Sequence, residues 1–217
     1  GRIVPATCDI VDIAGLVKGA SQSEGLGNQF LGNIRECDAI IHVLRCFDNG
    51  NIVHVDGSVN PVRDKEVIDT ELQLKDLETV ESRIKRVEKQ ANVGGDKMAK
   101  VELGLLLRYK EALEKGQSAR VVELETAEEE TVAKQMFLLT TKPVLYVCNV
   151  DDQSAKDGNE YVNAVREAIK GEDAQLLIIS AQTEADIAEL ESYEEKQMFL
   201  EDISRSEERR VGKECRS

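Results

Sequence analysis

Aromatic side chains are scarce in this sequence, which has no tryptophan and in which aromatic residues make up only 4% of 217 positions. Proteins that bind single-stranded nucleic acid stack its bases on such side chains, so a stacking platform is not expected. The sequence also lacks a secretory signal pattern and any apolar run of about 20 residues, the length that a membrane-spanning helix needs. We therefore expect no membrane association.

Cysteine and histidine are not arranged as a metal centre would require. The five cysteines form no C-x-x-C pair, the spacing typical of zinc sites and redox motifs. Cys8, Cys37 and Cys148 lie in or beside apolar runs, as buried free thiols do in a reducing compartment. His42 also lies in an apolar run and is expected to pack in the core, whereas His54 is expected at the surface. The thiols favour a cytoplasmic protein.

Negative charge predominates, with 42 acidic and 28 basic residues and a net charge of -14 at pH 7. This balance argues against broad binding to phosphate backbones, and no DNA partner is expected. A local basic patch is still compatible with it, because net charge governs long-range steering rather than one face. Hydrophobic residues make up 41% of the chain, which is enough for a packed core.

The apolar pattern predicts an α/β fold near both ends of the chain. Short β-branched runs indicate buried strands, and apolar residues at helical spacing follow them. A glycine-rich loop is predicted after Gly15. Strands that alternate with helices indicate a mostly parallel sheet. The strands are expected at residues 8–14, 38–47, 144–148 and 175–179, and the helices at 26–37, 157–170 and 184–200.

A long helical insertion is predicted between these parts. Asn60 and Pro61 suit the cap and the first turn of a helix, and residues 92–96, NVGGD, interrupt it. Apolar residues step by three and four along both flanking segments, the pattern of an antiparallel coiled-coil hairpin. Thr126 and Glu129 form a capping-box pattern that opens a shorter helix. The expected seam is Leu77, Val80, Ile84, Val87 and Ala91, facing Ala99, Leu103, Leu106 and Leu113 of a helix over residues 97–115.

A D-x-x-G motif, Asp12-Ile13-Ala14-Gly15, follows the first predicted strand. Ligands of open α/β sheets bind beyond the carboxyl ends of the strands, which is where this motif lies. A carboxylate there suits Mg²⁺ held through water, and the glycine lets a backbone N–H approach a phosphate. Alone, the motif indicates no more than a turn.

Two further polar motifs follow the last two predicted strands. Asn149-Val150-Asp151-Asp152 stands where Ras-type GTPases carry N-K-x-D, with Val150 in place of Lys. In that motif Asn braces the loop and Asp accepts hydrogen bonds from the base. The run Ser180-Ala181-Gln182 stands where a Ser-Ala pair closes over the base. Each motif alone is also common at polar strand ends, but their order along the chain favours a nucleotide site.

The chain resembles the YchF/Obg-like ATPase family over nearly all of residues 1–204. The run RIVPATCDIVDIAGLVKGASQSEGLGNQF is similar to the family's switch II region. Similar, too, are DAIIHVLRCF, HVDGSVNPVRD, DLETVESRIKRVEK, TKPVLYVCNV and EADIAEL. The resemblance implies an α/β fold: a partial P-loop NTPase G domain with a mostly parallel sheet and an inserted antiparallel coiled-coil helical hairpin.

This resemblance implies a division of the chain. Residues 1–58 would form the first part of the G domain, 59–140 the inserted helical domain, and 141–204 the second part. Residues 205–217, RSEERRVGKECRS, resemble a translated sequencing adapter and are expected to be a non-native tail; a disordered polar tail is the alternative. The motif G-x-x-x-x-G-K-[ST] does not occur. We therefore expect a fragment without the P-loop and the C-terminal TGS domain, unable to hydrolyse nucleotide at a useful rate.

The resemblance also implies the site. Leu16 stands where Ras-type enzymes have a water-orienting Gln, so no catalytic residue is assigned. The family usually has N-x-x-E as its base motif, associated with ATP, and Asp152 stands where Glu is usual. The base preference therefore stays open between ATP and GTP. The nucleotide-binding residues implied are Asp12, Ile13, Ala14, Gly15, Leu16, Asn149, Val150, Asp152, Ser180, Ala181 and Gln182, with Asp12 also holding Mg²⁺ through water.

The function implied is an ATP- or GTP-hydrolysing regulator, with ATP preferred, that acts in translation or stress and docks on the ribosome or another protein. The alternative is a non-catalytic scaffold that uses the coiled-coil arm. Arg83, Lys85, Arg86, Lys97 and Lys100 on that arm would contact ribosomal RNA in the first case. A solvated helix face is the other interpretation of these basic residues.

Overall fold

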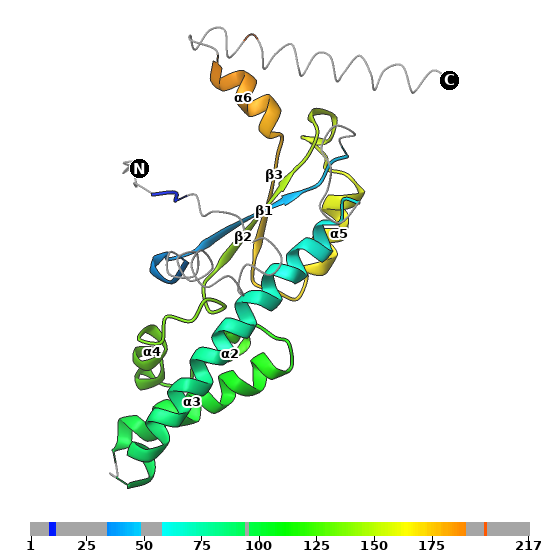
Figure 1. Ribbon diagram of the computed structural model, residues 1–217. Helices are drawn as coiled ribbons and strands as arrows, with labels where there is room; N and C mark the ends of the chain where they lie inside the picture. The colour runs from blue at the N-terminus through cyan, green and yellow to red at the C-terminus, as the bar shows by residue number, and fades with distance from the viewer. Residues whose placement is uncertain (1–8, 12–33, 49–57, 94–95, 190–197, 199–217) are drawn as a thin grey trace, which may run out of the picture. The chain divides into compact units, whose positions relative to one another are not determined.

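The computed structural model describes residues 9–11, 34–48, 58–93, 96–189 and 198 (Figure 1). Contacts divide the chain into two compact units, residues 1–41 with 62–145, and residues 42–61 with 146–217. The described strands are β1 (Ile40–Arg45), β2 (Val144–Asn149) and β3 (Gln175–Ile179), and the α-helices are α2 (Pro61–Val93), α3 (Lys97–Glu114), α4 (Ala127–Lys134), α5 (Glu160–Ala168) and α6 (Ala181–Glu189).

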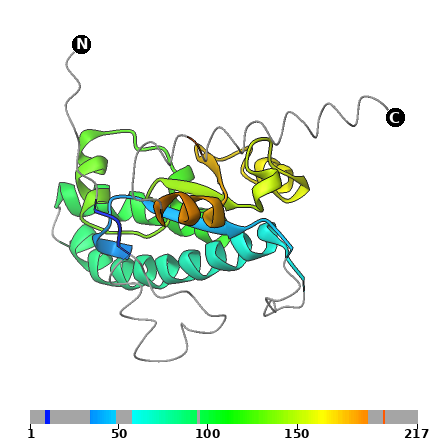
Figure 2. The same ribbon diagram turned by 90° about the horizontal axis from the view of Figure 1, so that it is seen from above.

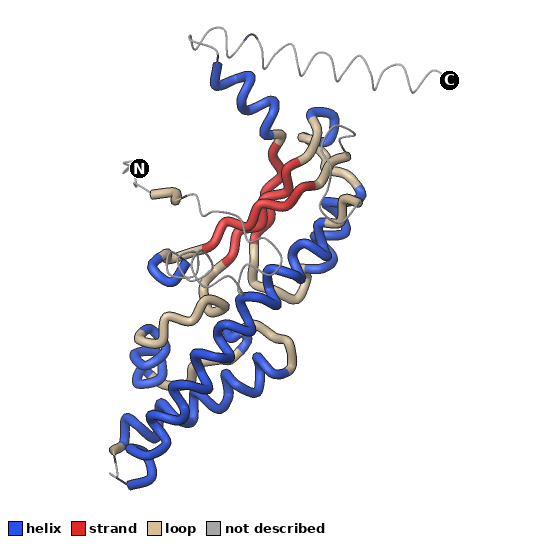
Figure 3. Tube along the Cα trace, viewed as in Figure 1, coloured by secondary structure: helices blue, strands red, loops and turns tan. Residues whose placement is uncertain are grey.

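The three strands form one sheet in the order β1-β2-β3 (Figure 3). The Ile40 N–H donates to the Pro143 carbonyl at 3.0 Å, and the Cys46 N–H donates to the Asn149 carbonyl at 2.7 Å. The two bonds join residues at the same sequence offset, so β1 and β2 run parallel. The predicted parallel α/β architecture is confirmed.

Two of the predicted strands differ from expectation. Asp9, Ile10 and Val11, the described part of the strand predicted at 8–14, form no strand, and Ile10 is 78% exposed. An apolar run shows only that a segment can form a strand, because the strand itself needs a neighbour for its N–H and C=O groups. In β1, Ile41 and Val43 are exposed while Leu44 is buried, so only one face of this predicted buried strand is covered.

The first unit is built on a helical pair, in which α2 and α3 lie side by side (Figure 1, Figure 2). Pro61 is the first residue of α2, as predicted. The Asp96 side chain accepts hydrogen bonds from the Met98 and Ala99 N–H groups and so caps α3. The predicted seam is confirmed as core: its members Val80, Val87, Ala91, Ala99, Leu106 and Leu113 are buried together with Leu105 and Tyr109, and Leu77, Ile84 and Leu103 pack against them.

The predicted capping box opens α4. The Thr126 Oγ1 accepts the Glu129 N–H at 3.2 Å, and the Glu129 carboxylate accepts the Glu125 N–H at 2.8 Å. Glu129 thus reaches one residue further back than the capping residue. The bond to Thr126 satisfies one of the N–H groups at the start of α4, and the bond to Glu125 holds the residue before the cap, so the two together fix where α4 begins.

The helices of the second unit begin at other residues than predicted. Gly158 has a φ of 79°, which a helix does not allow, and the Asn159 side chain caps the Val162 N–H at 3.1 Å. α5 therefore begins at Glu160 and ends at Ala168, inside the predicted range. α6 begins at Ala181, three residues before the prediction, because Ser180 accepts the Thr183 N–H. Residues 190–197 and 199–200 of that predicted helix lie outside the described residues.

Candidate functional site

The candidate site lies in the second unit, where β2 and β3 end. Val150 follows β2, is 3% exposed, and donates its N–H to the Ile179 carbonyl at 2.8 Å. This bond continues the pairing of the two strands past the last residue of β2. The buried apolar side chain of Val150 therefore anchors the polar residues on either side of it at the sheet edge.

Asn149, the last residue of β2, connects the two strand ends. Its side-chain oxygen accepts the Ala181 N–H at 3.0 Å, across 32 residues of sequence. Ala181 is the first residue of α6, so its N–H has no partner within the helix. The amide of Asn149 thus holds the start of α6 against the end of β2, and its role in bracing a base-binding loop stays a prediction.

Asp152 is held by two hydroxyl groups. Its Oδ1 accepts hydrogen bonds from the Ser180 Oγ and the Thr183 Oγ1, each at 2.5 Å. Bonds to a charged acceptor are shorter and stronger than neutral ones. The hydrogen bond from Ser180, followed by that from Thr183, holds the pKa of the Asp152 carboxyl below its ordinary value. Asp152 is therefore a fixed, ionised carboxylate at neutral pH.

Replacing Ser180 with alanine is expected to raise the pKa of Asp152 toward its ordinary value, because the ionised form loses its strongest donor. A carboxyl group whose pKa is lower in the folded than in the unfolded state stabilises the fold at pH values above its unfolded-state pKa. That stability is lost as the pH falls through its folded-state pKa. The Ser180→Ala chain should therefore lose less stability on acidification. Carboxyl NMR titration of the chain measures the shift. Gln182→Ala, which changes an exposed neighbour, should leave the pKa unchanged; an unchanged pKa in Ser180→Ala would contradict the assignment.

The predicted site residues fall into three groups. Asn149, Val150, Asp152, Ser180 and Ala181 come together through the bonds above. The Gln182 side chain instead donates to Asp186 within α6, at 2.9 Å. The remaining predicted residues, Asp12, Ile13, Ala14, Gly15 and Leu16, lie outside the described residues, and so does the predicted Mg²⁺ ligand.

Among the described residues, no three His, Cys, Asp or Glu side chains are grouped so that they could hold a metal ion. Cys46 and Cys148 are free thiols and fully buried, and Cys37 is half-buried. His42 is half-buried, and the centroid of its ring lies 5.7 Å from the centroid of the Tyr146 ring.

Sequence reasoning missed Thr183 and Asn159. Thr183 supplies the second hydroxyl group that donates to Asp152. The feature of the sequence that could have identified it is its position three residues after Ser180, at the start of a helix. Asn159 caps α5 and also donates from its side-chain nitrogen to the Cys46 carbonyl at 2.7 Å. It thereby connects the residue after β1 to α5 within the second unit. No pattern in the sequence pairs these two residues, which lie 113 positions apart.

The basic residues of the hairpin do not share one environment. Arg83 binds Glu102 at 2.5 Å and the Gln135 carbonyl at 3.0 Å, so the solvated-face interpretation is wrong for it. Lys85, Arg86, Lys97 and Lys100 are exposed. Arg83 therefore has a structural role, which leaves the other four as candidates for contact with a partner.

Comparison with known proteins identifies relatives of the chain. A family model described as 50S ribosome-binding GTPase matches residues 2–93. The ribosome-binding ATPase YchF of Bacillus subtilis is 50% identical over 204 residues, which are 93% of this chain and 55% of that protein. The chain belongs to the YchF/Obg-like ATPase family. Obg-like ATPase 1 of Xenopus laevis is 39% identical over 203 residues, 92% of this chain and 51% of that protein.

A solved member of the YchF family has the same fold. The structure of the YchF GTPase of Schizosaccharomyces pombe matches with a TM-score of 0.73 and 31% identity, over 87% of this chain and 51% of that one. The predicted G-domain fold is thereby confirmed. The chain spans about half the length of the YchF/Obg-like relatives that it matches. Among the described helices, none is long and apolar enough to cross a membrane.

Proposed function

We propose that the protein is an Obg-like nucleotide-binding NTPase of the cytoplasm that prefers ATP and acts as a ribosome-associated regulator in translation or stress. The names of its relatives, ribosome-binding ATPase and Obg-like ATPase, support this. Residues 1–58 and 141–204 form the G domain, residues 59–140 the inserted helical domain, and residues 205–217 a non-native tail. As part of the same proposal, Asp12 would hold Mg²⁺ through water, and the D-x-x-G motif from Asp12 to Gly15, with Leu16, would bind the terminal phosphate.

The observation that carries the proposal is the joined end of β2 and β3. Asn149 holds the N–H of Ala181, and Asp152 is fixed by the hydroxyls of Ser180 and Thr183. A carboxylate that is fixed before the ligand arrives costs little ordering on binding. Its position beyond the carboxyl ends of parallel strands is where α/β sheets bind ligands. A nucleotide base is the ligand that this arrangement suits.

Asn149→Ala is expected to weaken nucleotide binding by about tenfold, because losing one hydrogen bond of about 1.4 kcal/mol frees the start of α6. Titration of the full-length protein with ATP and with GTP, each with Mg²⁺, measures the affinity. Asn163→Ala removes an exposed amide from α5 and should leave binding unchanged. If the unmodified full-length protein binds neither nucleotide, the proposal fails and the scaffold function takes its place.

A further inference from the structure

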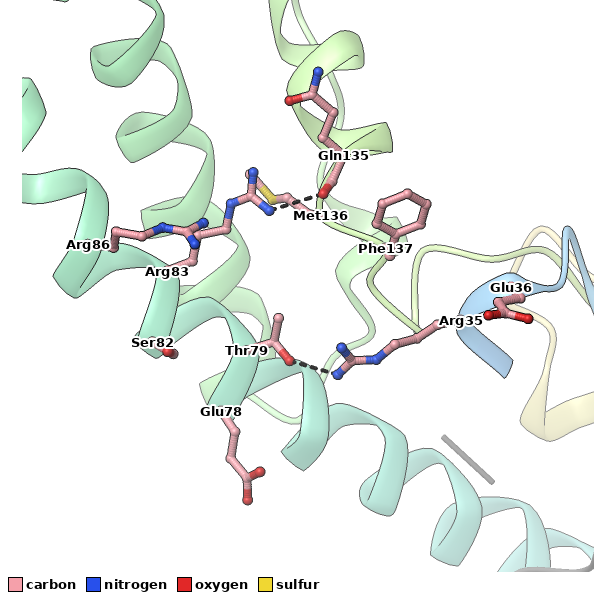
Figure 4. A pocket seen from close by; sticks show the side chains of 10 residues that line it. All are labelled: Arg35, Glu36, Glu78, Thr79, Ser82, Arg83, Arg86, Gln135, Met136 and Phe137. Carbon is pink, nitrogen blue, oxygen red and sulfur yellow. Dashed lines mark hydrogen bonds between the residues drawn. The ribbon is translucent and has the colours of Figure 1, made fainter. Parts of the chain in front are cut away.

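A cavity lies wholly within the first unit, which does not contain the proposed base site. Its volume is about 890 Å³, and it is lined by α2, by residues 35–36 and by residues 135–137, which follow α4 (Figure 4). Met136, 3% exposed, is buried beside it, and the Phe137 ring stands at its rim. The cavity is large enough to take side chains of another molecule.

Phe137 is held in an exposed position by its neighbours. Its side chain is 61% exposed, and its backbone has a φ of 51°, a left-handed conformation that side chains other than glycine rarely adopt. The residues around it are fixed: the Gln135 carbonyl accepts from Arg83 at 3.0 Å, and the Leu139 N–H donates to Asp76 at 2.8 Å. A strained, exposed aromatic side chain on a rigid support is typical of a contact residue rather than of a loose loop.

Two arginines that line the same cavity as Phe137 have hydrogen-bond donors to spare. Arg35 uses one side-chain nitrogen to bind the Thr79 hydroxyl at 3.1 Å, while the Arg83 guanidinium is committed to Glu102 and Gln135 (Figure 4). The Arg86 side chain makes no hydrogen bond or ion pair with the described residues, and it lines the same cavity. A guanidinium pairs best with a planar carboxylate or a phosphate.

The charge around the cavity favours a carboxylate over a phosphate chain. Glu36 and Glu78 also line it, and the whole chain carries a net charge of -14, which repels a polyanion. A protein segment with one or two carboxylates beside an apolar side chain avoids most of that repulsion. Aromatic side chains, Met and Arg around a cavity are the residues enriched at the centres of protein interfaces.

We propose that this cavity is a docking site for a segment of a partner protein that carries a carboxylate next to an apolar side chain. The apolar side chain packs on Phe137 and Met136, and carboxylates of the segment bind Arg35 and Arg86. The proposal does not depend on nucleotide binding, because every residue that it uses lies in the first unit.

Phage display tests the proposal. A library of random dodecapeptides is selected for binding to the full chain, and peptides that also bind Phe137→Ala are removed. The enriched peptides should place Asp or Glu next to Leu, Ile or Phe, and one of them, labelled, is the probe for fluorescence anisotropy. Phe137→Ala should weaken its binding about 30-fold, as for an interface hot spot. Arg86→Glu should weaken it about tenfold. Lys89→Glu makes the same charge change at an exposed residue of α2 outside the cavity and should change affinity by about twofold or less.

Phe137→Gly separates binding from folding. Glycine adopts a φ of 51° without strain, so this variant should unfold at a higher temperature and yet bind the peptide about 30-fold more weakly. Three results would overturn the proposal. They are a failure to enrich acidic-apolar peptides, binding of labelled poly-uridine that is lost in Phe137→Ala, and a concentration-dependent dimer in sedimentation that is lost in the same variant.

Discussion

Asp76→Ala is expected to lower the free energy of unfolding by about 3–5 kcal/mol, the range seen when one partner of a buried charged network is removed. Asp76 lies in α2 and is only 1% exposed. Its Oδ1 accepts the Leu139 N–H at 2.8 Å, and its Oδ2 accepts both the N–H and the hydroxyl of Thr140, each at 2.7 Å. Alanine would leave these donors buried without an acceptor.

The loss of stability should extend beyond the hydrogen bonds to Leu139 and Thr140, because Asp76 fixes the connection between α4 and β2. Thr140 in turn accepts the Ala119 N–H with its hydroxyl oxygen at 2.9 Å, so a second backbone segment depends on the same network. Burial raises the pKa of Asp76, and the hydrogen bonds from Thr140 and Leu139 oppose that shift. The donors thus offset part of the cost of burying the carboxylate.

Urea unfolding of the chain, followed by far-UV circular dichroism, measures the change. Glu78→Ala removes an exposed carboxylate two residues along the same helix and should cost about 0.5 kcal/mol or less. Asp76→Asn keeps the shape of the side chain but offers only one acceptor oxygen. Its loss of unfolding free energy should therefore fall between those of Asp76→Ala and Glu78→Ala. Equal stability of Asp76→Ala and Glu78→Ala would show that the network contributes nothing.

The helical part of the fold was predictable because local signals agree there. The apolar spacing, Pro61 at the start of α2 and the Asp96 cap of α3 all indicate the same two helices. Asp76 was not predictable, because an aspartate among charged helix residues is typical of a surface position. Its partner Thr140 lies 64 residues away, and no local pattern identifies it. The exposure of Phe137 depends on the same tertiary contacts.

Parts of the candidate site were predictable for a different reason. Asn149, Asp152 and Ser180 follow strands whose apolar runs are clear, and parallel strands bring their carboxyl ends to one edge. The structure then joins Asp152 to Thr183 and Asn149 to Ala181 by hydrogen bonds that depend on where α6 begins. The start of that helix was predicted three residues late, so the role of Thr183 was missed.

Asp152→Ala is expected to raise the preference for ATP over GTP by about 10- to 100-fold in the full-length protein. The Watson–Crick edge of guanine presents N–H donors at N1 and N2, and a fixed carboxylate is a strong acceptor for them. Losing hydrogen bonds to a charged group costs about 1.5–3 kcal/mol, which corresponds to that range. Adenine has no donor at those two positions, so ATP affinity should change by about threefold or less.

The adjacent residue supplies the control for this prediction. Asp151 is also exposed, caps the short helix that begins at Asp152 by accepting the Ser154 N–H at 2.9 Å, and has the same charge. Asp151→Ala should therefore leave the ratio of ATP to GTP affinity unchanged, which separates a base contact from a general effect of charge. Titration calorimetry with each nucleotide and Mg²⁺ measures both affinities. If Asp152→Ala weakens ATP and GTP equally, the carboxylate only braces Ser180 and Thr183, and base selection must come from other groups in the protein.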